Sequence, residues 1–212
     1  MNGSGIIRYL EPGIKLKIID LATLMIIVSD NVATRILIEI LGKENINHTI
    51  ESLGFEKTHL FGDYELNPEY KFRLGNTTPK EYGKFYEMLL KNELWSEDIS
   101  KKMLDILKKN TGSVLLKKGL KNYISGYAYS NTPMTSNNDF IKYIASKSGT
   151  IAGVRSDGGI ISTCYGEYIL SVFIVDFHDP FYSNDNEVIS QFSSVNKLIF
   201  DQFIALEGKF SL

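Results

Sequence analysis

The sequence contains little of several residue types, and each shortage excludes a class of protein. Cys164 is the only cysteine in 212 residues, so no disulfide can form within the chain. It lies in an apolar run, and we expect a buried, inert thiol. The three histidines, His48, His59 and His178, are scattered without a carboxylate or cysteine at ligand spacing, so no metal site and no cofactor are predicted.

Charge and hydropathy exclude further kinds of partner. The chain carries 23 basic and 25 acidic residues, a formal net charge of −2. Such a balance gives no basic surface for nucleic acid or an anionic membrane. No stretch approaches the ~20 apolar residues of a membrane span. Residues 1–5 lack the basic and apolar segments of a secretory signal, so no signal peptide is predicted in this chain.

Hydrophobic periodicity divides the chain into two regions. Residues 1–122 are predicted to be mostly helical, and residues 123–212 to hold an antiparallel sheet and a terminal helix. Helical patterns cover residues 21–28, 31–41, 43–53, a segment starting at the capping box Thr78-Pro79-Lys80-Glu81, 96–109 and 187–206. Strand patterns cover residues 140–148, 158–165 and 168–177, with a hairpin turn at Gly166-Glu167. The order predicts an α+β fold.

Two short polar strings lie about half a chain apart. Ser29-Asp30-Asn31 joins two predicted helices, and taken alone it is equally a common helix cap. Lys147-Ser148-Gly149-Thr150 closes the first predicted strand, where turn chemistry is the alternative explanation. Together they match S-D-N and K-T-G, two of the three signatures of serine β-lactamases and penicillin-binding proteins.

The chain resembles the class A serine β-lactamases and related penicillin-recognising enzymes. The resemblance rests on the two strings, on about fifteen positions from Asp20 to Thr34, and on Asp63-Tyr64-Glu65-Leu66-Asn67, which is similar to the E-x-E-L-N string of the omega loop. The three strings follow the family's order, and the likeness extends over residues 5–205. It implies a β-lactamase/transpeptidase-like fold and hydrolysis of a β-lactam amide through an acyl-enzyme. The implied partner is a small molecule, a β-lactam or a peptidoglycan peptide.

The resemblance implies a role for each residue of Ser29-Asp30-Asn31. The Ser29 hydroxyl relays a proton toward the lactam nitrogen as the ring opens. The Asn31 amide holds the carbonyl of the substrate's side chain, and Asp30 turns inward and fixes the loop that carries the other two. Compact polar side chains suit these tasks because they can be held rigidly.

The same resemblance assigns the second string to the substrate carboxylate. Lys147 raises the local positive potential, the hydroxyls of Ser148 and Thr150 bind the carboxylate, and Gly149 lets the strand approach the ligand closely. Arg155 lies a few residues further along the chain. It supplies a second cation in this interpretation, and an ordinary surface arginine is the alternative.

In the family, the omega loop holds the water that hydrolyses the acyl-enzyme. Aligned on Leu66 and Asn67, Asp63 takes the place of the family's glutamate and holds this water together with Asn67. Aspartate is one methylene shorter, and misplacing a general base by about 1 Å costs roughly 10²-fold in rate, so slow deacylation is expected. Glu65 in a shifted register is one alternative, and a solvated acidic loop is another.

The third signature, S-x-x-K, does not occur ahead of Ser29. Its one occurrence, Ser194-Val195-Asn196-Lys197, follows both other strings and lies on the terminal helical pattern, so we interpret it as chance. We therefore expect a truncated C-terminal portion that is inactive alone, from a bacterial protein that is secreted, periplasmic or on the cell surface at full length. The alternatives are a relative of D-alanyl-D-alanine peptidases and a non-catalytic module that binds β-lactam or peptidoglycan.

The last predicted strand suggests self-association. In the family's strand order it pairs with a strand that this chain does not supply, which leaves an apolar edge at Tyr168–Phe177. Long unpaired edges recruit other strands. We therefore expect a homodimer, or a swapped or complemented assembly, through this edge.

Overall fold

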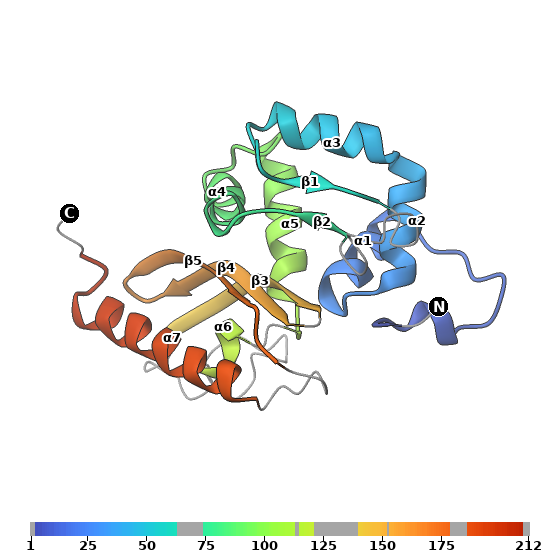
Figure 1. Ribbon diagram of the computed structural model, residues 1–212. Helices are drawn as coiled ribbons and strands as arrows, with labels where there is room; N and C mark the ends of the chain where they lie inside the picture. The colour runs from blue at the N-terminus through green and yellow to red at the C-terminus, as the bar shows by residue number, and fades with distance from the viewer. Residues whose placement is uncertain are drawn as a thin grey trace. The chain divides into compact units, whose positions relative to one another are not determined.

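The structure, a computed structural model, describes residues 3–62, 74–112, 115–120, 140–151, 153–178 and 186–209. Figure 1 shows the order of the helices and strands along the chain. The chain divides into two compact units, residues 1–82 and residues 83–212. The predicted division at residue 122 marks a change from helical to β-rich sequence, and it stays a prediction.

The first unit is built mainly from helices. In chain order its elements are η1 (Ile7–Tyr9), α1 (Ile18–Ile27), α2 (Asn31–Leu41), α3 (Lys43–Ser52), β1 (His59–Leu60), β2 (Gly75–Asn76) and the start of α4 (Pro79–Leu90). Buried Leu21, Ala33 and Leu37 form its core between α1 and α2. Burying a leucine side chain contributes about 1.5–3 kcal/mol, so this small cluster stabilises the helix pair.

Hydrogen bonds at two helix starts explain where these helices begin. The sequence predicts Asp20 as an N-cap, but α1 begins earlier, and the Lys17 main-chain nitrogen donates to Asp20 Oδ2 at 3.1 Å. At α4, the Glu81 nitrogen donates to Thr78 Oγ1 at 3.2 Å, which agrees with the predicted capping box. The Glu81 carboxylate also accepts from Thr58 Oγ1 at 2.6 Å and so attaches α4 to the segment before β1.

The second unit contains the predicted antiparallel sheet and terminal helix. Its elements after α4 are α5 (Glu97–Lys108), α6 (Leu115–Lys118), β3 (Ile141–Ile151), β4 (Val154–Thr163), β5 (Gly166–Val175) and α7 (Glu187–Ala205). The three strands follow one another in the order β3-β4-β5, each antiparallel to its neighbour. The predicted α+β fold is confirmed. Strand β4 begins four residues before the predicted strand. The sequence did not show this start because Arg155, Ser156 and Asp157 are polar and interrupt the apolar pattern.

Helices α6 and α7 supply the apolar cover of the sheet. The buried core contains residues from both helices and from the two strands β3 and β4: Leu116, Leu120, Ile141, Ile144, Ile161 and Phe200. The ring of Tyr168 on β5 lies 4.7 Å from that of Phe203 on α7. Figure 1 shows α7 lying along the sheet. Within the described ranges, no helix is long and apolar enough to cross a membrane.

The prediction of a buried cysteine is wrong. Cys164 is exposed, in the turn that joins β4 to β5. The predicted hairpin turn at Gly166-Glu167 lies two residues too late, since Thr163 pairs with Gly166 and the turn residues are Cys164 and Tyr165. Tyr165 is an aromatic residue, a type more typical of strands than of turns, so the sequence pattern continues through the turn without a break.

Candidate active site

Ser29-Asp30-Asn31 forms the corner between α1 and α2. Ser29 has a backbone φ of +52°, in the left-handed region that non-glycine residues rarely occupy. The next nitrogen, that of Asp30, donates back to the Leu24 oxygen at 3.2 Å and closes the corner. Asp30 is then the N-cap of α2, because its Oδ1 accepts from the Ala33 nitrogen at 3.0 Å. The helix-cap interpretation of this string is therefore correct, and it is compatible with a role in a site.

Asp30 is the anchor of this corner. The side chain is fully buried, and its Oδ2 accepts from the main-chain nitrogens of Ile6 at 2.6 Å and Ile7 at 2.9 Å. Burial alone would raise the pKa of this carboxyl, but the hydrogen bonds from Ile7, Ala33 and Ile6 outweigh that effect and hold the pKa below its usual value. The carboxylate therefore ties the N-terminal segment to the corner.

Two glycines in that N-terminal segment lie against the corner, and the sequence interpretation missed them. Gly3 and Gly5 have φ values of +120° and +113°. A Cβ atom on Gly3 would overlap the Asn31 side-chain amide, and one on Gly5 would overlap the Asp30 side chain. The Asn31 nitrogen also donates to the Ser4 oxygen at 3.1 Å. The string Gly3-Ser4-Gly5 was the only sign in the sequence that the chain passes close to this corner.

The predicted deacylation residues lie outside the described residues. This applies to Asp63 and Asn67, and to the alternative Glu65. The two ends of their segment are joined by β1 and β2, in which His59 pairs with Asn76 and Leu60 with Gly75.

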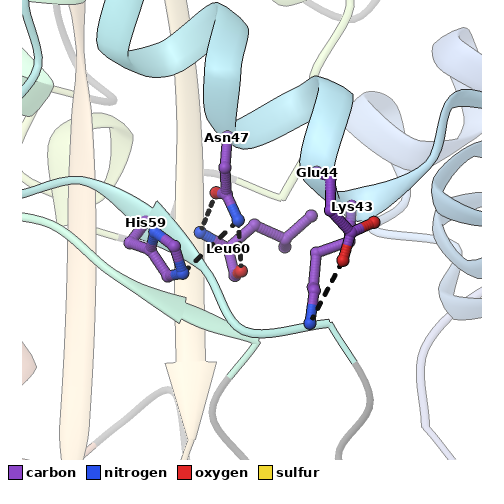
Figure 2. Close-up of polar contacts among 5 residues, drawn as sticks. All are labelled: Lys43, Glu44, Asn47, His59 and Leu60. Carbon is purple, nitrogen blue, oxygen red and sulfur yellow. Dashed lines mark hydrogen bonds and ion pairs between the residues drawn. The ribbon is translucent and has the colours of Figure 1, made fainter.

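Asn47 on α3 holds the first of these strands from the side. Its amide donates to the Leu60 oxygen at 2.9 Å, and its Oδ1 accepts from the Leu60 nitrogen at 2.8 Å, as Figure 2 shows. The same amide lies 3.4 Å from His59 Nε2. Lys43 and Glu44, at the start of α3, form an exposed ion pair of 3.7 Å. Two reciprocal bonds to one residue fix β1 against α3, although nothing in the sequence pattern marked Asn47.

Lys147-Ser148-Gly149-Thr150 lies on β3 and pairs with β4. Lys147 is opposite Gly158, and its Nζ donates to the Ser148 oxygen at 2.6 Å. Ser148 Oγ donates to the Gly112 oxygen at 2.8 Å. A Cβ on Gly149 would lie 2.7 Å from Ser156 Oγ on β4, so a larger residue here would require the Ser156 hydroxyl to move.

The segment that leads into α6 is bonded to the same strand end. Asn110, 2% exposed, donates from its amide to the Ser146 oxygen at 2.6 Å. Asp157 is fully buried on β4, and its Oδ2 accepts from the nitrogens of Leu115 at 3.2 Å and Leu116 at 3.1 Å. The sequence interpretation missed Asn110 and Asp157, because their partners are 36 to 42 residues away.

Two lysines beside this strand end are electrostatically linked to Asp157. Burial lowers the pKa of Lys147 and of Lys117, and the negative charge of Asp157 acts in the opposite direction on both. The K-S-G-T string therefore lies among buried charges of both signs.

Arg155 is buried at the start of β4, next to the turn from β3. The residue is 2% exposed, and its Nη1 donates to the Ile151 oxygen at 2.8 Å and to the Val154 oxygen at 2.9 Å. Its guanidinium lies 5.3 Å from the centre of the Phe177 ring. These contacts hold the turn between β3 and β4, so the alternative of an ordinary surface arginine is wrong. Its service as a second cation stays a prediction.

Among the described residues, no group of three or more His, Cys, Asp and Glu side chains is placed to hold a metal ion. Two groups of candidate residues are therefore described separately: a capped helix corner in the first unit, and a lysine-bearing strand end in the second.

The fold combines a helical region, an antiparallel sheet and a C-terminal helix. It carries S-D-N at a helix corner and K-S-G-T at a strand end, and these features are those of a β-lactamase/transpeptidase-like protein. The sequence matches the model of the "Beta-lactamase enzyme family" over residues 1–203, and the chain belongs to that family. The suspected relationship is therefore confirmed. No curated protein sequence matches the chain.

Solved structures agree with this assignment. A β-lactamase from Sphaerobacter thermophilus DSM 20745 is 25% identical, with a TM-score of 0.74, over 95% of this chain and 70% of its own. PBP-A, in an acyl-enzyme complex with penicillin G, is 24% identical, with a TM-score of 0.73, over 97% and 69%. A class A β-lactamase representative from Bacteroides cellulosilyticus DSM 14838 is 19% identical, with a TM-score of 0.66, over 90% and 67%. The last two similarities show the fold.

Proposed function

We propose that this chain is a β-lactam-binding scaffold of the serine hydrolase type, whose chemistry is cleavage of the lactam amide through an acyl-enzyme. The observation that carries the proposal is the strand end at Lys147-Ser148-Gly149-Thr150, where a half-buried lysine and two hydroxyls lie side by side on a strand held by Asn110 and Asp157. A cation beside hydroxyl donors suits a ligand carboxylate. Family membership supports the reaction class.

In this proposal the strand end binds the carboxylate of the ligand. Lys147, Ser148 and Thr150 bind the carboxylate, and Gly149 keeps the strand close to the ligand. Arg155 adds positive charge behind them. These are charge-assisted contacts, which are roughly twice as strong as neutral hydrogen bonds.

The helix corner has the other tasks. The Ser29 hydroxyl relays a proton to the lactam nitrogen, Asn31 holds the amide carbonyl of the ligand, and Asp30 keeps both in place through its bonds to the N-terminal segment. The strained φ of Ser29 supports this, because such backbone conformations persist where surrounding contacts fix them and are frequent at functional sites.

Turnover is the part of the chemistry that the sequence does not supply. No S-x-x-K precedes Ser29 in this sequence, so we propose that this chain by itself binds β-lactams without hydrolysing them. Asp63 would hold the deacylating water with Asn67, or Glu65 would take its place. An aspartate there favours slow deacylation, as in penicillin-binding proteins.

The test combines nitrocefin hydrolysis with intact-mass spectrometry after incubation with benzylpenicillin. We expect no turnover and no acylated serine, together with reversible binding in a calorimetric titration. Steady nitrocefin hydrolysis by the pure chain would overturn the claim that it does not turn over. A chain that neither binds nor reacts would overturn the whole proposal.

Two other functions share the same site. The missing S-x-x-K favours a non-catalytic module that binds β-lactam or peptidoglycan. A relative of D-alanyl-D-alanine peptidases is the other candidate, because that class shares S-D-N and K-T-G, although the omega-loop string argues against it. A titration with a peptide ending in D-alanyl-D-alanine separates them from a β-lactamase scaffold. Binding of the peptide more tightly than benzylpenicillin would favour the peptidoglycan ligand.

We also propose that the protein associates through the outer edge of β5. Among the described residues, β5 is the last strand of its sheet, and Val175 at its end is 55% exposed. An unpaired strand edge offers backbone groups to a second copy, giving a homodimer, or a swapped or complemented assembly. Light scattering tests this, and a monodisperse monomer at micromolar concentration would contradict it. The family relationship further suggests that the full-length bacterial protein is secreted, periplasmic or on the cell surface.

A further inference from the structure

Three ionisable side chains, one fully buried and two half-buried, belong to the elements that meet at the K-S-G-T strand end. They are Lys147 on β3, Asp157 on β4 and Lys117 on α6, all in the second unit. Asp157 is directly opposite Ser148 in the antiparallel register, so it stands next to the residue that follows Lys147. Its side chain is fully buried. None of the roles proposed above uses Asp157 or Lys117.

Asp157 joins this strand end to α6 by hydrogen bonds. Its Oδ2 accepts from the nitrogens of Leu115 at 3.2 Å and Leu116 at 3.1 Å, the first two residues of α6. Lys117 follows immediately, and its Nζ donates to the Asn110 oxygen. One carboxylate therefore fixes the start of the element that carries the second lysine.

The negative charge of Asp157 offsets the cost of burying the positive charges of Lys147 and Lys117. A carboxylate buried alone is costly, and so are two ammonium groups buried side by side. Two positive charges and the negative charge of Asp157 leave a net positive charge. The electrostatic effect of Asp157 reaches both lysines, and it opposes the effect of burial, which favours their neutral amines. A neutral amine would no longer attract an anionic ligand.

We propose that Asp157 is a positioning residue of the candidate site: its carboxylate is the shared counter-charge of Lys147 and Lys117, and it fixes α6 against the K-S-G-T strand end. This deepens the proposed function and rests on it only where a β-lactam is the ligand. Asp157 does not touch the ligand in this scheme. It acts through Lys147, whose positive charge meets the ligand carboxylate.

Three substitutions separate the charge of Asp157 from its hydrogen bonds. Asp157→Asn removes the charge but keeps an oxygen that can accept from Leu115 and Leu116. Asp157→Glu keeps the charge, and Asp157→Ala removes both. Asp98→Asn, at an exposed position in the first turn of α5, is the matched control for the loss of one negative charge.

The main measurement is the titration of the lysine Nζ signals by nuclear magnetic resonance in the full chain, with Lys147 and Lys117 assigned from their arginine variants. In Asp157→Asn, we expect Lys147 to lose its proton at a lower pH than in the wild type, while Asp98→Asn leaves it unchanged. Benzylpenicillin affinity should fall by about tenfold or more in Asp157→Asn, with the largest loss at alkaline pH, and Asp157→Glu should restore part of it. A purely structural Asp157 would leave the Lys147 titration of folded Asp157→Asn unchanged, and that result overturns the proposal.

A second measurement needs no variant. When Asp157 takes up a proton at acid pH in the wild type, the Nζ signals of both lysines should shift with the same midpoint as the Asp157 carboxyl signal. Lysine signals that do not respond at this midpoint would overturn the proposal even if every Asp157 variant fails to fold. A wild type that shows the coupled titration but does not bind benzylpenicillin would contradict the proposed function and leave the role of Asp157 intact.

Discussion

The side-chain amide of Asn110 donates a 2.6 Å hydrogen bond to the main-chain oxygen of Ser146, the residue directly before Lys147. The same side chain accepts from the Gly112 nitrogen at 2.9 Å through its Oδ1. Ser148 Oγ in turn donates to the Gly112 oxygen. The segment after α5 and the K-S-G-T strand end are therefore bonded to each other at alternate residues, which fixes the strand end by hydrogen bonds.

Removing the Asn110 amide should destabilise the second unit. Asn110→Ala leaves the buried Ser146 oxygen without this donor, and losing such a bond costs about 1–3 kcal/mol. Urea denaturation monitored by circular dichroism measures the change in unfolding free energy. The control is Gln202→Ala, at an exposed position on α7, which should change it by less than ~0.5 kcal/mol. Equal stabilities for the two variants would contradict the role given to Asn110.

Gly5→Ala should lower the free energy of unfolding by more than the positive φ of Gly5 alone explains. Gly5 and Gly13 both have positive φ, +113° and +93°, but a Cβ on Gly5 overlaps Asp30 while one on Gly13 meets nothing within 4 Å. We expect a loss of roughly 0.5–1 kcal/mol in Gly13→Ala from backbone strain and about 2–4 kcal/mol in Gly5→Ala, where overlap adds to strain. Thermal unfolding of both variants checks this difference. Identical melting temperatures would show that Gly5 does not support the corner.

Asp30 should make stability depend on acid pH. Its pKa in the folded state lies below that of the unfolded chain, so the folded state holds fewer protons and gains stability above the unfolded value. This stability is lost as pH falls below about 4 and through the lower folded pKa. Asp30→Asn should therefore be less stable than the wild type at pH 7, and the difference should shrink in acid.

Denaturation at a series of pH values tests this expectation, with the exposed Glu51→Gln as control. A difference between Asp30→Asn and the wild type that stays constant from pH 7 to the acid limit of folding would contradict the role of the Asp30 charge.

Arg155→Lys should lower stability although it keeps the charge. One guanidinium nitrogen of Arg155, Nη1, donates to the oxygens of both Ile151 and Val154, while the planar group lies 5.3 Å from the Phe177 ring centre. The shorter, non-planar lysine side chain does not reproduce this combination of contacts. We expect a loss of about 1–3 kcal/mol in unfolding free energy. Arg35→Lys, in an exposed ion pair of 3.4 Å with Glu39, should change it by less than ~0.5 kcal/mol.

The sequence predicted those parts of the fold that depend on local patterns. The periodic apolar residues of α2 and the cap at Ser96 of α5 are visible in a window of one or two turns, and both are confirmed. The start of β4 was missed because Arg155 and Asp157 are polar yet buried. Cys164 was wrongly predicted to be buried because the aromatic Tyr165 shares its turn, so the turn resembles part of a strand.

The candidate site was predictable only where a short motif marks it. Ser29-Asp30-Asn31 and Lys147-Ser148-Gly149-Thr150 stand at an element end, where capping and strand termination explain their composition. Asn110, Asp157 and the two glycines beside the helix corner act through partners far along the chain, and no local pattern specifies such a pairing. Their contribution follows from the three-dimensional structure alone.

Binding of benzylpenicillin measured by isothermal titration calorimetry is the most direct test of the central claim. The account predicts reversible binding to the wild type. It also predicts a loss of about tenfold or more in Lys147→Met, which keeps most of the apolar stem but removes the charge. Lys142→Met, at an exposed position on the same strand, should bind like the wild type. Equal affinities for the wild type and Lys147→Met, or no binding to the folded wild type, would contradict the account.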